Sequence, residues 1–248
     1  MAGLLKDKVA VITGASRGIG YAVSVELARA GAHLVLMART VGGLEEVDDA
    51  VRKEGGSATL VPASLTDGPA IDRLGQAIHD RWGRLDIVIG NAGILGPLSP
   101  IGHVKTKDWD EVLAINLTAN WRLIRSLDPL LRASAAGRAV FVTSGAARSA
   151  KPYWGPYAIS KAALETMVRT YAAEVAQLGI RANLFSPGPV RTAMRAKAMP
   201  GEDPATLPKP RDVAPAFLDL LAPDLEHTGM IYDWPTKSWI DPATGQAV

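Results

Sequence analysis

Short apolar runs alternate with longer segments of helical periodicity along most of the chain. Apolar runs are expected as strands at residues 9–13, 33–38, 58–62, 85–90, 138–144, 180–186 and 230–234, with helices at 18–31, 44–54, 67–82, 106–131 and 156–178 between them. Continuous apolar strands are typical of a parallel sheet that helices cover on both faces. The pattern predicts an α/β protein with a three-layer, doubly wound Rossmann-type fold and a mostly parallel sheet of about seven strands.

One segment interrupts the alternation. Residues 187–210 hold six prolines, which favours a surface loop or a short helix. Long loops in compact domains often cover binding sites. Because no internal repeat is visible, we expect residues 1–248 to form one domain, with a substrate loop at about 189–212.

Composition limits the classes of partner. The 248 residues include 27 Lys and Arg against 25 Asp and Glu, and no basic stripe is interleaved with aromatic residues, so we expect no nucleic-acid partner. No apolar run reaches the ~20 residues of a membrane helix, and no signal-peptide pattern opens the chain, so a cytoplasmic protein without a membrane partner is expected. There is no cysteine, and the four histidines lack ligand spacing, so we expect no metal site.

The first predicted strand runs into glycines. Thr13-Gly14-Ala15-Ser16-Arg17-Gly18-Ile19-Gly20 joins this strand to the start of a helix. Glycine lets a phosphate approach the backbone, and the free amides at a helix N-terminus hold the anion. A tight turn without a ligand is the alternative, but the position directly after the first buried strand favours a dinucleotide.

The end of the second strand bears on the choice of cofactor. An acidic residue there would bind the 2′-hydroxyl of NAD, but Ala38, Arg39 and Thr40 follow instead. Arg39 and Arg17 could flank a 2′-phosphate, for which the planar guanidinium is suited, although both could also be ordinary surface arginines. The sequence favours NADP(H), with NAD(H) as the alternative.

Tyr157 and Lys161 stand four residues apart on a predicted helix and so share a face. A free tyrosine has a pKa near ~10, and a neighbouring ammonium is expected to lower it. Such a pair can protonate a carbonyl oxygen as hydride arrives, or remove the proton in reverse. The spacing alone is common on helix surfaces, but Ser144, at the end of a predicted strand, could hold the same substrate oxygen.

These residues together resemble the short-chain dehydrogenase/reductase family over essentially the whole chain. The matching residues are Thr13-Gly14-x-x-x-Gly18-Ile19-Gly20, Asn91-Ala92-Gly93, Asn116, Ser144, Tyr157-x-x-x-Lys161 and Asn183-x-x-x-Pro187-Gly188-x-x-x-Thr192. The region from Ala193 to Trp234 is similar to that of a bacterial subgroup that prefers NADP.

The resemblance implies a single NAD(P)-binding domain and hydride transfer between the nicotinamide and a carbonyl or alcohol substrate. Tyr157 would be the general acid/base, Lys161 would support it and bind the ribose, Ser144 would orient the substrate oxygen, and Asn116 would support a proton relay. The implied cofactor-binding residues are Gly14, Ser16, Arg17, Gly18, Ile19, Gly20, Arg39, Thr40, Ser64, Leu65, Asn91, Ala92, Gly93, Tyr157, Lys161, Pro187, Gly188, Val190 and Thr192.

The chain departs from the family pattern at three places. Gly90 replaces the first of two paired asparagines, which is expected to loosen a sheet hydrogen bond, and Ser64 replaces an acid that contacts adenine. The usual Val-Asp-Gly-Gly ending is replaced by Ile231-Tyr232-Asp233-Trp234-Pro235. Because that ending helps to build tetramers in the family, a homodimer through the two long helices is expected, with a homotetramer as the alternative.

No motif in the sequence identifies the substrate. Trp154 and Met194 are candidates for the substrate pocket, although an aromatic at a helix start or a methionine filling a gap would look the same. A reductase of 3-oxoacyl thioesters is one alternative, since Arg191, Arg195 and Lys197 could meet an acidic carrier protein. A non-enzymatic NADP-binding sensor or scaffold is another, but such proteins typically lose the tyrosine or the lysine.

Overall fold

One sheet runs through the middle of the molecule. In the computed structural model, which describes residues 3–247, eight strands lie in the order β3-β2-β1-β4-β5-β6-β7-β8. All neighbours pair in parallel except β7 and β8, which are antiparallel. The strands are β1 (Val9–Thr13), β2 (His33–Ala38), β3 (Ser57–Pro62), β4 (Ile87–Gly90), β5 (Arg138–Val142), β6 (Arg181–Ser186), β7 (Ile231–Asp233) and β8 (Ser238–Ile240). The predicted Rossmann-type sheet is confirmed, with one strand more than the expected seven.

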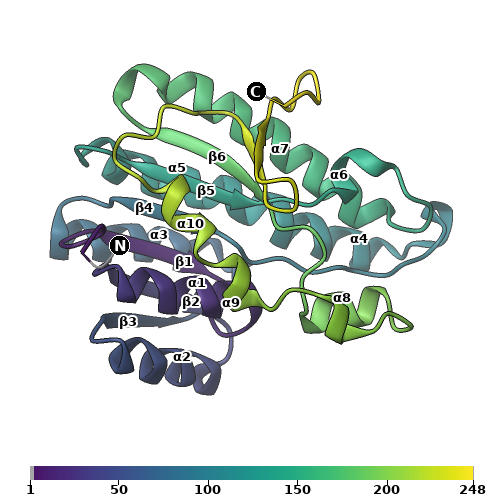
Figure 1. Cartoon of the computed structure of the whole chain (residues 1–248), viewed down its shortest axis with the longest axis horizontal. Coiled ribbons are helices and arrows are strands. Elements are labelled where there is room, and N and C mark those ends of the chain that lie inside the picture. Colours follow the sequence, from purple (N-terminus) through teal and green to yellow (C-terminus); the bar gives the residue numbers. More distant parts are fainter. Residues whose placement is uncertain (1–2, 248) are drawn as a thin grey trace.

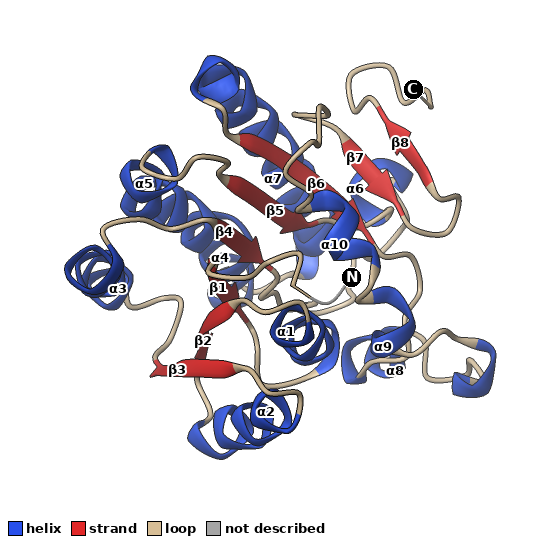
Figure 2. Ribbon diagram, turned by 60° about the vertical axis from the view of Figure 1, so that its left-hand side comes forward, coloured by secondary structure: helices blue, strands red, loops and turns tan. Residues whose placement is uncertain are grey.

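Helices cover both faces of the sheet and complete three layers (Figure 1, Figure 2). One layer holds α1 (Gly18–Arg29), α2 (Val41–Lys53), α9 (Pro210–Val213) and α10 (Ala216–Leu220). The other holds α3 (Gly68–Trp82), α4 (Thr106–Leu113), α5 (Ala119–Arg132) and α7 (Gly155–Val175).

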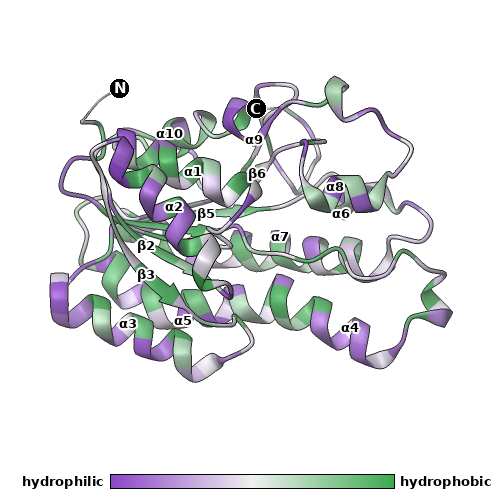
Figure 3. Cartoon of the chain, turned by 90° about the horizontal axis from the view of Figure 1, so that it is seen from below, coloured by the Kyte–Doolittle hydropathy of each residue, from purple (hydrophilic) through white to green (hydrophobic). Residues whose placement is uncertain are grey.

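The apolar runs are continuous because each strand has two buried faces. In β1, Ala10 and Ile12 pack in the cluster with α1 and α2, whereas Val9 and Val11 pack in the cluster with α3, α5 and α7. Figure 3 shows the resulting apolar sheet between helices whose outer faces are hydrophilic. A strand with one polar face could contribute to only one of these two clusters.

The strand order reverses direction between β1 and β4. From β1 the chain winds outward to β3, and from β4 it winds the opposite way to β7. The carboxyl ends of β1 and β4 therefore diverge into a crevice, which is where open α/β sheets bind ligands. Thr13 and Gly90, at these two ends, lead directly into the glycine-rich turn and into Asn91.

The predicted helix at 106–131 is present, but its middle is π-helical. A π-helical turn, Ala114–Thr118, separates α4 from α5, and α5 ends at Arg132, within one turn of Pro129. A π turn inserts one residue into a helix and disturbs the normal bonding of its carbonyls. The carbonyl of Asn116 accepts a bond from the side chain of Asn120 at 2.8 Å, which stabilises this interruption.

Several short helices have no periodic signal in the sequence. These are α6 (Ala146–Ser149), α8 (Ala193–Ala198) and the 3₁₀ turns Ile101–His103 and Pro204–Thr206, while a third 3₁₀ turn, Ala176–Leu178, forms the end of the helix predicted at 156–178. The expectation of a loop or a short helix over 187–210 is confirmed, since α8 lies within it. The Thr192 hydroxyl caps α8 by accepting a hydrogen bond from the amide of Arg195 at 3.2 Å.

The atypical C-terminal ending folds as a hairpin on the edge of the sheet (Figure 1). Tyr232 in β7 stacks on Phe185 of β6 at 6.2 Å between ring centroids and meets the edge of Trp239 in β8 at 5.3 Å. β8 therefore covers the side of β7 that would otherwise be the sheet edge. No helix among residues 3–247 is long and apolar enough to cross a membrane.

Candidate active site

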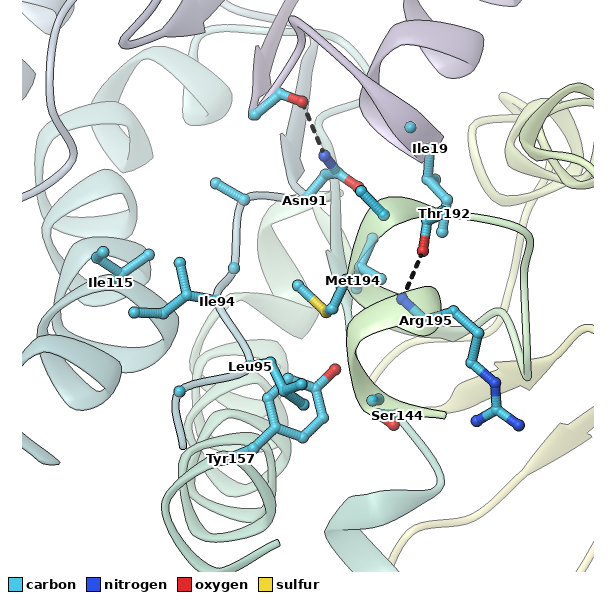
Figure 4. A pocket seen from close by; sticks show the side chains of 18 of the residues that line it. Ile19, Asn91, Ile94, Leu95, Ile115, Ser144, Tyr157, Thr192, Met194 and Arg195 are labelled. Atoms are coloured by element: carbon cyan, nitrogen blue, oxygen red, sulfur yellow. Dashed lines mark hydrogen bonds between the residues drawn. The ribbon is translucent and has the colours of Figure 1, made fainter. Parts of the chain in front are cut away.

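A cavity of about 1130 Å³ opens at the carboxyl ends of the strands, on the crevice between β1 and β4. It brings together predicted site residues from most of the chain (Figure 4). The lining includes Gly14, Ser16, Arg17, Gly18, Ile19, Arg39, Thr40, Ser64, Leu65, Asn91, Ala92, Gly93, Ser144, Trp154, Tyr157, Lys161, Pro187, Gly188, Val190, Thr192 and Met194. Two further predicted residues, Gly20 and Asn116, are buried and do not line the cavity.

The glycine-rich turn is shaped for close approach of a ligand. Gly14 has a φ of +65°, and a Cβ on it would stand 2.9 Å from the Cα of Ala92. The first helical bond of α1 runs from the amide of Tyr21 to the carbonyl of Arg17 at 3.4 Å. The amides before Tyr21 are therefore the unbonded first donors of α1, and they favour an anion at this point.

Asn91 and Thr13 tie the ends of β1 and β4 together. The Asn91 side-chain amide donates to the carbonyls of Thr13 at 2.9 Å and Gly14 at 3.3 Å (Figure 4). The Thr13 hydroxyl accepts from the amides of Asn91 and Ala92, both at 3.1 Å. These bonds fix the shape of the turn, so Asn91 supports the ligand site through the backbone.

Positive charge gathers at the outer end of the cavity. Arg17, at the start of α1, and Arg39, after β2, are both exposed lining residues. The acids among the described lining residues are Asp108 and Glu111, and both come from α4. Arg39 after β2 and Arg17 before α1 thus face a ligand, as the sequence predicted, and the end of β2 offers it no carboxylate.

Tyr157, Lys161 and Ser144 converge at the inner end. Figure 4 shows the Tyr157 side chain directed into the cavity, with Ser144, Leu95 and Met194 around it. The ammonium of Lys161 lies 5.9 Å from the centroid of the Tyr157 ring and donates to the carbonyl of Val142 at 2.8 Å. The predicted helix pair is therefore present, and β5 anchors its lysine.

The pKa of Tyr157 is raised, which corrects the expectation that Lys161 lowers it. Burial of the phenol is the main cause, and its hydrogen bond with Ser144 opposes it in part. Burial also lowers the pKa of Lys161 to about 8, against the attraction of Glu165. Desolvation disfavours both charged forms, and it is the largest cause of both shifts. Tyr157 is thus a neutral phenol at neutral pH.

Asn116 stands in the π turn, fully buried, with its side chain in structural bonds. It accepts from the amide of Ile94 at 2.8 Å and donates to the carbonyl of Ile94 at 2.9 Å and to the Ser160 hydroxyl at 3.0 Å. Its side chain therefore holds the loop after β4 against α7. The proton-relay role of Asn116 stays a prediction.

An apolar cluster that sequence reasoning largely missed lies beside Tyr157. Leu95 and Ala198 are buried there, with Met194, Trp154 and Met199 packed against them. Trp154 meets the edge of the Tyr157 ring at 6.0 Å between centroids. Leu95 follows the Asn91-Ala92-Gly93 turn, and Ala198 is the last residue of α8. No sequence pattern identifies either position as part of a site.

Among residues 3–247, no group of three or more His, Asp or Glu side chains could hold a metal ion. The polar groups of the cavity are instead amides, hydroxyls and the cations described above.

Comparisons with known proteins agree with this geometry. The model of the short chain dehydrogenase family matches residues 8–203. The oxidoreductase YciK of Escherichia coli (strain K12) is 37% identical over 93% of this chain and 92% of its own.

Solved structures extend the likeness to the whole fold. A short chain dehydrogenase from Pseudomonas syringae is 35% identical, with a TM-score of 0.91 over 94% of this chain and 96% of its own. A short chain dehydrogenase from Escherichia coli CFT073, complexed with NADPH, is 37% identical, with a TM-score of 0.88 over 93% and 98% of the two chains. The family that the motifs resemble is confirmed: this chain belongs to the short-chain dehydrogenase family of oxidoreductases.

Proposed function

We propose that this protein is an NADPH-dependent reductase of carbonyl compounds in which Tyr157 donates the proton. The observation that carries the proposal is the buried, neutral phenol of Tyr157 beside Ser144 and Lys161, in a cavity that begins at a glycine-rich turn. A neutral phenol is a proton donor, which fits reduction of a carbonyl better than oxidation of an alcohol.

NADP(H) is the cofactor that the residues fit best. The glycine turn suits the pyrophosphate, and Arg17 and Arg39 offer planar donors to a 2′-phosphate. The relative from Escherichia coli CFT073 binds NADPH in its structure, which supports the same cofactor here. NAD(H) remains the alternative, and the two are separated by their apparent KM values. When bound, the nicotinamide supplies the hydride.

The chain's own residues then handle the oxygen and its proton. Ser144 orients the carbonyl oxygen, and the phenol of Tyr157 donates its proton to that oxygen as negative charge develops there. The ammonium of Lys161 favours the tyrosinate that remains. Because Val142 and α7 fix Lys161, this charge is held in place before reaction.

The substrate side of the cavity favours an apolar group next to the carbonyl. Leu95, Trp154, Met194 and Ala198 form its wall around Tyr157. Apolar walls with a few placed polar groups are typical of small-molecule sites. We therefore expect ketones or aldehydes with a hydrophobic substituent to be better substrates than sugars of the same size.

A 3-oxoacyl thioester reductase is less well supported. The guanidinium of Arg195, one of three cations proposed to meet an acidic carrier, pairs with Glu202 through two bonds of 2.6 Å. Of the three proposed cations, this pairing leaves Arg191 and Lys197 as the exposed ones. A non-enzymatic sensor is disfavoured because Ser144, Tyr157 and Lys161 converge on one cavity.

We also propose that two copies associate through α5 and α7. Trp121 is 48% exposed and Ile159 is 39% exposed. A shallow hollow between the helices is lined by Leu117, Thr118, Trp121, Ala163, Thr166 and Met167. Sedimentation equilibrium distinguishes the expected homodimer from a homotetramer or a monomer.

The experiment that tests the proposed function is Tyr157→Phe. With a ketone found active in a panel of carbonyl compounds, turnover should fall roughly 10²–10⁴-fold, because the ring remains but its proton is lost. NADPH binding, followed by fluorescence titration, should stay within about twofold. Turnover that survives in the Phe variant would show that Tyr157 is not the proton donor.

A further inference from the structure

A buried carboxylate stands one helical turn beyond the proposed catalytic pair. Glu165 lies on α7, is 7% exposed, and continues the stripe of Tyr157 and Lys161 at the same spacing of four residues. The proposed reaction uses no group at this position. A buried glutamate needs charged or hydrogen-bonding partners, so its contacts indicate what it does.

The partners of Glu165 stand on both sides of Ser144. The hydroxyl of Thr143 donates to Oε1 of Glu165 at 2.7 Å, and the guanidinium of Arg148 donates to the same oxygen at 2.6 Å. Thr143 directly precedes Ser144, and Arg148 lies in α6, which follows it. One carboxylate oxygen thus ties the strand end and the following turn to α7.

The connection that Glu165 holds is under backbone strain. Ala150 has a φ of +44° and Tyr153 a φ of +71°, both in the left-handed region that favours glycine. Such conformations persist only where surrounding contacts enforce them. Ser149, Lys151 and Trp154 from this connection line the cavity, so its position shapes the substrate side.

Glu165 also acts on Lys161 through charge. Its carboxylate raises the pKa of Lys161, which burial otherwise lowers to about 8. Among the described residues, the titratable groups that face Lys161 are Tyr157 and Glu165 on α7, while Arg148 from α6 offsets part of the charge of Glu165. The protonation state of Lys161 therefore depends on the carboxylate of Glu165, and Arg148 in α6 balances part of that negative charge.

We propose that Glu165 is a positioning residue that keeps Lys161 protonated and holds the segment around Ser144 against α7. Arg148 carries the opposite charge and weakens the effect of the Glu165 carboxylate on Lys161. The catalytic role of Glu165 rests on the proposed function. Its electrostatic effect on Lys161 does not, because this effect can be measured without any substrate. Removing Glu165 should make Lys161 easier to deprotonate. Removing Arg148 should have the opposite effect.

The test is a direct titration of Lys161 in the whole protein without added cofactor. Lysine labelled with ¹³C at Cε is incorporated, the Lys161 signal is assigned from its loss in Lys161→Arg, and its chemical shift is followed from pH 6 to 11. Glu165→Gln keeps the size of the side chain and removes its charge. Arg148→Gln removes the counter-charge. Glu174→Gln, on an exposed position of the same helix, is the matched control.

The expected titration midpoint of Lys161 is about 8 in the parent and in Glu174→Gln. It should fall by about one pH unit in Glu165→Gln and rise in Arg148→Gln, because the loss of one nearby charge typically shifts a pKa by about that amount. A general loosening of the fold would move both variants toward the ordinary value of lysine. Shifts of the same sign in both, or no shift in Glu165→Gln, would overturn the inference.

Steady-state rates add a second readout. The pH at which carbonyl reduction declines should move in Glu165→Gln in the same direction as the Lys161 midpoint, and Arg148→Lys should restore the parent profile. If no carbonyl compound is reduced by any variant, the proposed function fails while the titration still decides the role of Glu165.

Discussion

The side chain of Asn120 shares the space beside Gly90 with the ring of Phe141. A Cβ on Gly90 would meet the Phe141 ring first and would lie 2.6 Å from Oδ1 of Asn120, while Nδ2 of Asn120 bonds the carbonyl of Asn116 at 2.8 Å. Gly90 still pairs with Phe141 in the sheet, so the pairing expected to loosen is kept. Gly90 thus stands where the family has an asparagine, and the side-chain amide of Asn120 in α5 lies beside it. The same amide supports the π turn that contains Asn116.

This relationship predicts coupling between positions 90 and 120. Gly90→Ala should destabilise the protein by about 1–3 kcal/mol, because the new methyl group enters a packed space. Asn120→Ala should also destabilise, by about 1–3 kcal/mol, because the buried carbonyl of Asn116 loses its partner. In urea unfolding, the double variant should be less destabilised than the sum of the two, by about 0.5 kcal/mol or more. Strict additivity would contradict the shared space.

The lowered pKa of Lys161 predicts the pH dependence of activity. The ammonium is present below its pKa and lost above it, so kcat/KM for carbonyl reduction should decline as the pH rises through about 8. Lys161→Arg keeps a cation at all accessible pH values, and its profile should lack this decline at any rate it retains. A parent profile that is flat between pH 7 and 9 would rule out Lys161 as the group responsible.

The arginines at the outer end of the cavity predict the cofactor preference. Arg39→Gln should raise the apparent KM for NADPH about tenfold or more, since a charge-assisted hydrogen bond contributes ~1.5–3 kcal/mol. The KM for NADH should hardly change, because NADH carries no 2′-phosphate. Arg52→Gln, at the far end of α2, is an exposed control that should alter neither value. Equal effects on both cofactors would point to a general disturbance of the site.

Asp86 predicts acid sensitivity of the fold away from the cavity. It is 1% exposed and accepts from the Ser134 hydroxyl at 2.6 Å, the amide of Val9 at 3.0 Å and the ammonium of Lys8 at 3.2 Å. Burial raises its pKa, but these bonds outweigh burial and leave the pKa below its ordinary value. Its contribution to stability is therefore present above pH ~4 and is lost as the pH falls toward the depressed pKa.

Asp86→Ala should consequently lower the free energy of unfolding by about 3–5 kcal/mol at pH 7, because its buried partners lose their acceptor. Asp72→Ala removes an exposed carboxylate paired with Arg125 and should cost ~1 kcal/mol or less. Urea unfolding at pH 7 and pH 3 measures both. The gap between Asp86→Ala and the parent should narrow at pH 3, and a constant gap would contradict the role assigned to the carboxylate.

The sequence by itself determined the fold class and most of the polar residues that line the cavity. Continuous apolar strands cannot be buried on one face alone, so the doubly wound sheet followed from periodicity. Parallel strands end at one edge, so Gly14, Arg39, Asn91 and Ser144 had to gather there. The spacing of Tyr157 and Lys161 required only that their helix form.

Only the tertiary structure decided the charge states and the supporting contacts. Burial depends on what packs around a side chain, and it raised the pKa of Tyr157 where the sequence predicted a lowered value. The π turn at Asn116, the apolar wall around Leu95 and the contact of Glu165 with both sides of Ser144 arise from segments far apart in the chain. No local sequence pattern predicts these contacts, because they depend on how distant helices, strands and loops pack together.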